Sequence, residues 1–466
     1  MILKDVSRRA FLNRASLLSI AGAAGPFVMN LAAMGEAAAA TASDYKALVC
    51  VFLYGGNDYA NTLVPYDNAT YATYAAQRTG LNYTQAQVAA TLLNPSVALA
   101  GGRQYALAPE LGKLLPVFDA GKMAVMLNLG TLVQPTTKAQ YQANSVKLPP
   151  KLLSHNDQQS YWQATNPEGA TSGWGGRIGD LLQSGNGTAT LTCINASANA
   201  VFLTGQAAVQ YAVTPSGPVA LNARNSLGGS ASAANLLQGL MNGTVGGGHQ
   251  MQAALAGVGG RALTLYSQVS TALAAAPVTT TAFPAAADTQ SSLGAQLQLV
   301  AKLISVSSQL GAKRQVFFVS TSRFDTHDGL DTLHPLLLTN LSDALRAFYD
   351  TTVELGVASQ VTTFTASDFG RALTSNNDGT DHGWGSMHFV LGGAVNGGRY
   401  YGINPTLANN GPDDIGQGRL IPTMSVDQYA ATLASWFGVS AGNLSTVVPN
   451  IGNYAGSALG TTLGFV

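Results

Sequence analysis

Asp325 and His327 are the residues of this sequence that most directly indicate chemistry. They follow an apolar run, Gln315 to Ser320, that reads as a buried strand. In an extended segment, residues two apart point the same way, so the two side chains can bind one cation together. A carboxylate and an imidazole on one side of a strand end favour metal ligation over a purely structural role.

Other aspartates and histidines follow the same pattern. Asp58 comes after the first apolar run on a glycine turn, although alone it would read as an ordinary turn residue. Asp368 follows the fourth run, and Asp381, His382 and His388 lie in or just after a glycine-rich loop. The series predicts one polar site built from several loops. His334 falls in a helical stretch and is predicted to be structural.

Ser154 begins a helical stretch that continues through Trp162. The free amides of a helix N-terminus favour an anion and developing negative charge, which suits a nucleophile. A serine at this position is also a common helix N-cap. The two interpretations are compatible, because a nucleophile at a helix start also occupies the capping position.

The elements that must position these residues alternate between strand and helix. Helical stretches, for example Leu107 to Ala120 and Leu333 to Leu355, separate four apolar runs that are typical of buried parallel strands: Ala47 to Tyr54, Met123 to Leu129, Gln315 to Ser320 and Gln360 to Thr365. This predicts an α/β fold with a doubly wound, mostly parallel sheet, whose ligands bind beyond the carboxyl ends of the strands.

The composition changes between about residues 181 and 311, where Ala, Gly, Ser, Thr and Gln dominate. We predict short strands or hairpins over Thr188 to Leu221 and a helix over Leu293 to Leu310, together forming an inserted cap over the sheet. His388 to Val395 is predicted as a further strand. Gly392 to Gly398 reads as its end and a hairpin turn.

The first residues indicate export. Arg8 and Arg9 precede an apolar run from Ala15 to Ala33 and an alanine-rich tract, which together predict a twin-arginine (Tat) signal peptide over residues 1–42 and a mature domain over 43–466. The alternative is a membrane anchor or buried helix, but glycines and Pro26 interrupt the run. We therefore expect passage through the Tat machinery to the periplasm or the exterior, with no membrane span in the mature chain.

Conversion of Arg8 and Arg9 together to lysine is expected to leave the precursor in the cytoplasm, because the Tat receptor reads the arginine pair. Cell fractionation measures this. Normal export of the double variant would contradict the localisation.

The charge balance and the absence of several known motifs disfavour some classes of protein. The chain has 23 basic and 23 acidic residues, so no strong field points to nucleic acid or anionic lipid. No Gly-x-Ser-x-Gly elbow, Walker loop, His-Glu-x-x-His or dinucleotide fingerprint occurs. Cys50 and Cys193 could pair in an exported protein, but Cys50 lies in an apolar run where a buried free thiol is favoured.

These motifs resemble those of the exported bacterial family called domain of unknown function 1501. The matching pieces span nearly the whole mature chain: Leu53 to Asp58, Asn61-Thr62, Ser154-His155, Asp325 to His327, Asp368 to Arg371, Asp381 to Trp384, and Ile421 to Gly438. The family is similar to a distant branch of the alkaline phosphatase and sulfatase superfamily, which cleaves phosphate or sulfate esters with one or two divalent metals.

The resemblance implies roles for individual residues. Ser154 would be the nucleophile, with His155 and Arg371 as further catalytic residues and Arg371 binding the anionic group. It implies metal ligands at Asp58, Asp325, His327, Asp368 and His382, supported by Asn61, Asp381 and His388. One metal is expected and a second is open, because Phe369 stands where the superfamily has a histidine and because Asp325 and His327 are closer together than usual.

The metal preference follows from the ligand types. Asp325, His327 and His382 suit zinc or a similar transition metal, while Asp58 and Asp368 would favour magnesium, manganese or calcium. The sequence thus supports two hypotheses. The first is an exported metal-dependent hydrolase of small anionic or polysaccharide-derived esters. The second is a non-catalytic, metal-binding or assembly protein that kept the fold, which the presence of Phe369 favours.

Overall fold

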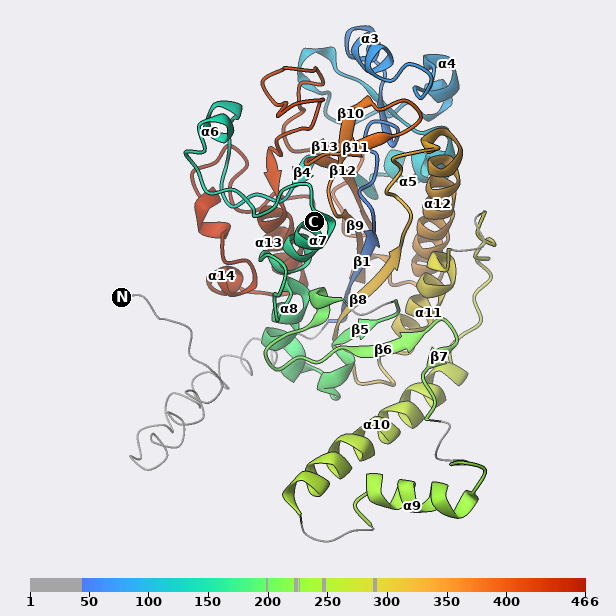
Figure 1. Ribbon diagram of the computed structural model, residues 1–466. Coiled ribbons are helices and arrows are strands. Elements are labelled where there is room, and N and C mark those ends of the chain that lie inside the picture. The colour runs from blue at the N-terminus through green and yellow to red at the C-terminus, as the bar shows by residue number, and fades with distance from the viewer. Residues whose placement is uncertain (1–43, 198–199, 222–224, 226, 245–248, 288–290) are drawn as a thin grey trace.

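A computed structural model describes residues 44–466 except 198–199, 222–224, 226, 245–248 and 288–290 (Figure 1). The predicted signal peptide lies outside the described residues. Among the described residues, no helix has the length and apolar character needed to cross a membrane.

A ten-stranded sheet forms the centre of the molecule, in the order β13-β4-β12-β9-β1-β8-β5-β6-β7, with β14 beside β4. The four predicted strands are present as β1 (Lys46–Leu53), β4 (Met123–Gly130), β8 (Arg314–Thr321) and β9 (Val361–Ser367). β1 pairs in parallel with β8 and β9. β4 runs in the same direction, because β12 (Ser386–Gly392) lies antiparallel between β4 and β9. The mostly parallel α/β sheet is therefore confirmed.

Helices cover both faces of the sheet. Alternate residues of β1 serve two cores: Val49 and Val51 pack with α11 (Leu293–Ser305) and α12 (Leu330–Glu354), whereas Cys50 and Phe52 face α8 (Trp174–Leu182) and α13 (Val426–Phe437). This period of two with both faces apolar is the reason that the run reads as a buried strand.

The other elements connect or border this core. They are β2 (Leu63–Pro65), β3 (Tyr105–Leu107), β5 (Cys193–Asn195), β6 (Tyr211–Thr214), β7 (Gly217–Pro218), β10 (Arg371–Ser375), β11 (Thr380–His382), β13 (Arg399–Tyr401), β14 (Met424–Ser425), α3 (Asn68–Gln77), α4 (Gln85–Val88), α5 (Leu115–Asp119), α6 (Lys138–Gln142), α7 (His155–Ala164), α9 (Ala231–Met241), α10 (Gln250–Ala274) and α14 (Leu444–Val447).

The helical stretch expected over Leu107 to Ala120 is present as a 3-10 helix, Pro109–Leu114, followed by the short α5, with Pro109 and Pro116 in the first turns of these two segments. One local prediction is wrong. The hairpin expected at Gly392 to Gly398 does not form, since β13 pairs in parallel with β4 instead of folding back on β12.

The region expected as an inserted cap over the sheet contributes both short strands to the sheet and, through α11, a helix that packs on one of its faces. β5 pairs with β8 and β6 pairs with β5, so these short strands extend the sheet. α9 and α10 project from the opposite end of the molecule to β10 and β11 (Figure 1). The carboxyl edge of the central strands is thus left uncovered by this insertion.

Both cysteines are buried and free. Burial raises the pKa of the Cys50 thiol well above its usual range and that of Cys193 to about 12. Both are therefore expected to remain protonated, unreactive thiols.

Asp427, in the first turn of α13, is fully buried. Burial raises its pKa to about 7, although Asn450 and the charge of Arg177 act in the opposite direction. The pKa in the unfolded chain is about 3.9, so the carboxyl group stabilises the fold below that pH and this contribution is lost as the pH rises through 7.

Asp427→Asn is therefore expected to be more stable than the wild type at pH 8, by on the order of a few kcal/mol, with the difference disappearing near pH 4. Urea unfolding at several pH values measures the effect. Asp331→Asn, exposed in the first turn of α12, is the matched control and should leave the pH dependence unchanged. A constant difference between Asp427→Asn and the wild type at all pH values would contradict the prediction.

Candidate metal centre

Three imidazoles and one carboxylate meet beyond the carboxyl ends of β8 and β9. His155, Asp325 and His382 each place one ligand atom within 4.8 Å of the others. His327 joins them, with its Nε2 2.9 Å from His382 Nε2 and 3.2 Å from Asp325 Oδ1. These residues come from α7, β11 and the loop after β8, so separate segments build the centre as the sequence predicted.

Each imidazole is held by its outer nitrogen. His155 Nδ1 lies 2.6 Å from Asp368 Oδ2, and His382 Nδ1 lies 2.8 Å from the carbonyl oxygen of Leu153. His327 Nδ1 is 3.5 Å from Asp381 Oδ1. Nε2 of all three therefore faces Asp325, with the lone pair directed inward when Nδ1 carries the proton. Metal-binding histidines in proteins typically bond their second nitrogen in this way.

The spacing of the inner atoms suits one transition-metal ion. His155 Nε2 is 3.3 Å from Asp325 Oδ2, and His382 Nε2 is 3.2 Å from Asp325 Oδ1. Ligands about 2.0–2.1 Å from a tetrahedral ion are roughly 3.3 Å apart. His155 Nε2 is also buried and has no hydrogen-bond partner among the described residues. This orphaned atom, the donor set and the spacing all fit a bound divalent metal.

Asp325 is held by Arg371 and remains partly exposed to solvent. Arg371 is fully buried and donates to Asp325 Oδ1 over 2.6 Å, and it also donates to the Gly55 carbonyl and to Thr380. The Asp325 side chain is 41% exposed. The guanidinium thus has its protein partners already, and its role in this structure is to hold Asp325 rather than to face an anion.

Gly55 is required where β1 ends. It has φ +117°, and an added Cβ would lie 2.3 Å from the Asp325 amide nitrogen. Its own amide donates to Asp368 Oδ2 over 3.1 Å. One glycine therefore lets both carboxylates approach the end of β1.

The backbone around the centre is conformationally unusual. Leu153, whose carbonyl holds His382, has φ 71°, and Lys151 and Arg323 have φ 44° and 78°. Positive φ is uncommon for non-glycine residues and is concentrated at functional sites. Leu153 directly precedes Ser154, Lys151 lies three residues before it, and Arg323 lies two residues before Asp325.

Electrostatics differ among the centre's groups. The hydrogen bond to Asp368 raises the pKa of His155, and burial lowers that of His382. Burial acts to raise the pKa of Asp325, but the hydrogen bond and charge of Arg371 outweigh it and lower that pKa. Asp325 is therefore an anion, as a metal ligand must be.

Asp58 lies outside this ligand group. Its carboxylate is fully buried and paired with Arg78 over 2.7 Å, and it accepts hydrogen bonds from the amides of Ala60 and Asn61. Arg78 also bonds the Asn61 side chain and the carbonyls of Ala372 and Leu373. The guanidinium of Arg78 therefore lies beside Asp58, at the position where a metal cation was expected from the sequence.

Asp368 contacts the outer nitrogen of His155 and not the inner ligand atoms. It is buried and bonded by His155, Gln159 and the Gly55 amide. Among the described residues, the group of His155, Asp325 and His382 is the one set spaced for a metal. The structure thus brings together the predicted Asp325, His327 and His382, adds His155 to them as a candidate ligand, and leaves Asp58 and Asp368 outside the set.

Ser154 is next to the centre, as the N-cap residue of α7. Its hydroxyl donates to Asp157 Oδ2 over 3.0 Å instead of capping the helix. Asp157 is buried, and Lys151 approaches it at 3.6 Å. The hydroxyl therefore has a carboxylate partner that can accept its proton.

The predicted supporting residues separate into three environments. Asp381 contacts His327, whereas Asn61 belongs to the Asp58 and Arg78 network. His388 is buried in the core against Thr365 and Trp162, and burial lowers its pKa to about 3. His334 is buried beside Asn57, in agreement with its predicted structural role.

Two supporting residues were missed by sequence reasoning. Gln159 lies one helical turn after His155, and this spacing could have placed it on the same face of α7. Arg78 carries no such signal, because its partners are distant in sequence. Phe369 packs its ring 4.9 Å from that of His155 and 4.7 Å from that of His382, which makes an apolar wall for the two imidazoles.

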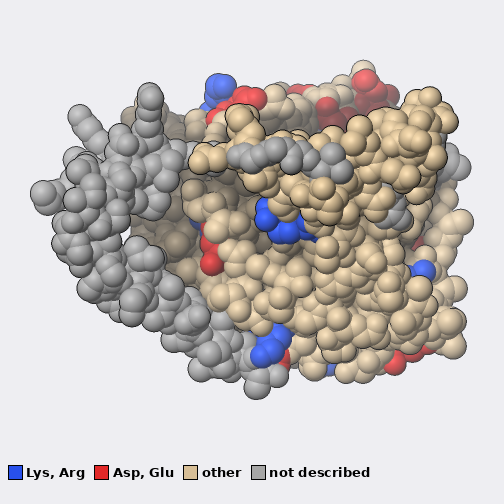
Figure 2. All heavy atoms as spheres, turned by 90° about the horizontal axis from the view of Figure 1, so that it is seen from below, with Lys and Arg blue, Asp and Glu red and all other residues tan. Residues whose placement is uncertain are grey.

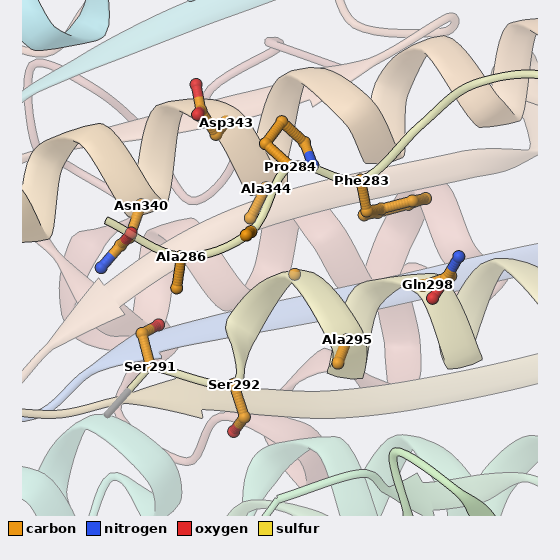
Figure 3. Close-up of a pocket in the computed structure, with 12 residues that line it drawn as sticks. Phe283, Pro284, Ala286, Ser291, Ser292, Ala295, Gln298, Asn340, Asp343 and Ala344 are labelled. Carbon is orange, nitrogen blue, oxygen red and sulfur yellow. The ribbon is translucent and has the colours of Figure 1, made fainter. Parts of the chain in front are cut away.

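A hollow of about 190 Å³ elsewhere on the molecule lacks these features. Figure 3 shows it between α11, α12 and the segment before α11, with Ser292, Ala295 and Gln298 on one side and Asn340 and Asp343 on the other. Lys113 already pairs with Asp343 over 2.5 Å. No histidine lines the hollow, so we place the chemistry at the imidazole cluster.

Comparison with known proteins gives one family. A family model described as protein of unknown function (DUF1501) matches residues 45–444. A search of curated proteins found no match.

Solved structures give two points of comparison. The lipoteichoic acid synthase LtaP from Listeria monocytogenes aligns with a TM-score of 0.34 and 9% identity, over 88% of this chain and 78% of that chain. A Bacteroides thetaiotaomicron protein designated 4S-sulf, from a core genetic locus for metabolism of multiple glycosaminoglycans, aligns with a TM-score of 0.33 and 9% identity over 85% and 73%.

Proposed function

We propose, from the premise that the chain belongs to the family described as protein of unknown function (DUF1501), that it is an exported metal-dependent hydrolase of phosphate or sulfate esters. The observation that carries the proposal is the convergence of three Nε2 atoms on Asp325, each imidazole being held by its other nitrogen. His155, Asp325 and His382 would hold one ion, and His327 lies beside them against Asp325 and His382.

The charge of the centre supports an anionic substrate. A divalent ion added to Asp325, Asp368 and Arg371 would leave a net positive charge at a partly exposed position. When bound, the metal would act as a Lewis acid that stabilises charge on the phosphoryl or sulfuryl oxygens. A small anionic ester or one derived from a polysaccharide fits this chemistry.

The chain itself would supply the nucleophile and its base. Ser154 Oγ would attack phosphorus or sulfur while its proton passes to Asp157, the carboxylate 3.0 Å away. The ester oxygen would leave with the bonding electron pair and take a proton, and water would then release Ser154. Arg419, which donates to the His382 carbonyl over 2.8 Å and is partly exposed, is the cation beside the centre that we propose for substrate binding, in place of the enclosed Arg371.

A second function is favoured by three features. The hydroxyl of Ser154 is bonded to Asp157, Arg371 is enclosed, and Phe369 replaces a ligand histidine beside Asp368. A non-catalytic exported protein that binds a metal, and that assembles with a partner, would need none of these groups to react.

Turnover of phosphate and sulfate monoesters by the purified exported protein tests the two functions. We expect activity that Ser154→Ala abolishes while the metal is retained. Ser160→Ala, on the same helix and bonded to the Pro167 carbonyl, is the matched control. Metal retention without turnover of any ester would contradict the hydrolase and support the binding function.

A further inference from the structure

The helical hairpin of α9 and α10 exposes an unusual number of apolar side chains. Nine of the fourteen large apolar residues that are exposed in the described part of the chain lie between Val219 and Val278. The most prominent are on the hairpin itself: Leu236 (54% exposed), Leu240 (37%), Met251 (76%), Leu255 (70%) and Val258 (57%). Exposed apolar side chains gathered in this way mark an interaction surface.

These five side chains lie on one side of the hairpin. Ala234 of α9 and Gly259 of α10 are the buried residues where the two helices pack together, and Gly259 faces Met241. At about 100° per residue, Met251, Leu255 and Val258 form one stripe beside this contact line. Leu236 and Leu240 form a second stripe, which the antiparallel direction of α9 places on the same side.

The charge of the hairpin limits what can cover it. Arg261 is the one Lys, Arg, Asp or Glu among the described residues of α9 and α10. Figure 2 looks at the end of the molecule that carries the hairpin, where few visible side chains are charged. A charged partner would be left unpaired here, and interfacial lipid-binding helices typically carry several Lys or Arg residues. An uncharged, apolar helical surface is the matching partner.

We infer that the hairpin pairs with the hairpin of a second copy of this chain. A two-fold axis brings the same uncharged stripes face to face, so each copy supplies the surface that the other needs. The two hairpins then form a four-helix bundle. The five side chains expose on the order of 500 Å² per copy, which the intervening small residues increase towards the roughly 800 Å² per partner of a stable interface.

The location of the hairpin is compatible with this pairing. It projects from the end of the molecule opposite to β10 and β11, which border the imidazole cluster (Figure 1). Two copies joined through their hairpins would leave both metal centres open to solvent. The pairing is independent of the proposed hydrolase function.

Light scattering after size-exclusion chromatography tests the inference. The purified exported protein is expected to have twice the mass of one chain, and Leu255→Glu to halve that mass. Val97→Glu, a 52% exposed apolar residue outside the hairpin, is the matched control and should keep the larger mass. A wild type of single-chain mass at micromolar concentrations overturns the inference, as does equal mass in Leu255→Glu and the wild type.

Cysteine cross-linking gives a second measurement that does not require disruption of the hairpin. Both native cysteines are buried, so Met251→Cys, Leu255→Cys and Val258→Cys each add one accessible thiol. We expect at least one of them, and not Val97→Cys, to form a disulfide-linked dimer on mild oxidation. Failure of all three overturns the inference. Binding of single chains to phosphatidylcholine vesicles, lost in Leu255→Glu, overturns it in favour of a lipid surface.

Discussion

His155→Ala is expected to release the bound metal on dialysis, although the sequence alone gives this histidine no ligand role. Its Nε2 faces Asp325 and its Nδ1 is held by Asp368, so alanine removes a ligand and the link to the buried carboxylate together. His382→Ala should act in the same way, because it removes the other imidazole of the same set. Elemental analysis after dialysis of protein exported from cells measures the loss.

Asp368→Asn is the informative companion to these variants. Asp368 contacts the imidazole of His155 and not the inner ligand atoms, so its replacement should lower metal affinity by roughly 10- to 100-fold without changing the stoichiometry. His388→Ala, a buried histidine in the core, is a control that removes an imidazole away from the centre. A wild type that holds no metal and gains no stability from zinc or manganese would contradict the site and favour a metal-free role.

Arg78→Met is expected to have the largest effect on stability. Arg78 and Asp58 are both fully buried, and methionine would leave the Asp58 carboxylate without its counter-charge. Loss of one partner of a buried ion pair costs about 3–5 kcal/mol in free energy of unfolding. Urea unfolding measures it, and Arg346→Met, which breaks a surface pair with Asp350, should cost well under 1 kcal/mol.

The double variant distinguishes the destabilisation caused by an unpaired charge from that caused by altered packing. Arg78→Met with Asp58→Asn should be destabilised by less than the sum of the two single changes, because no unpaired charge remains. All of these variants should bind the same number of metal ions as the wild type when folded. Loss of metal in Asp58→Asn alone would contradict the assignment of Asp58 to the ion pair and restore it as a ligand.

The parts of the fold that the sequence predicted are those with a strong local pattern. The four buried strands are continuous apolar runs, and α12 has a long helical period, so tertiary contacts reinforce the local signal. The stretch from Leu107 to Ala120 is helical, and its two prolines divide it into a 3-10 helix and the short α5. The hairpin after β12 fails because pairing of β13 with β4 depends on a distant strand.

The same division holds for the metal centre. Asp325 and His327 could be identified because parallel strands deliver their carboxyl ends to one edge, and His382 follows from the antiparallel pair of β10 and β11 that comes after β9. Asp58 also follows the carboxyl end of a strand, but its side chain forms an ion pair with Arg78 at the end of α3. The local sequence does not specify which charged side chains will form such pairs. The direction of the Ser154 hydroxyl and the enclosure of Arg371 are likewise set by neighbours that are distant in sequence.

The placement of β1 at the centre of the sheet has a consequence for the rate at which the chain folds. Its partners, β8 and β9, lie more than half of the chain away in sequence, so neither edge of β1 can be paired until most of the protein has been synthesised. Contacts this distant carry a large loop-closure entropy and slow folding. During that time an eight-residue apolar strand offers two open edges for aggregation. A secretion route that accepts finished domains, as the Arg8 and Arg9 pair predicts, suits such a chain better than one that threads it unfolded and requires the sheet to assemble after crossing.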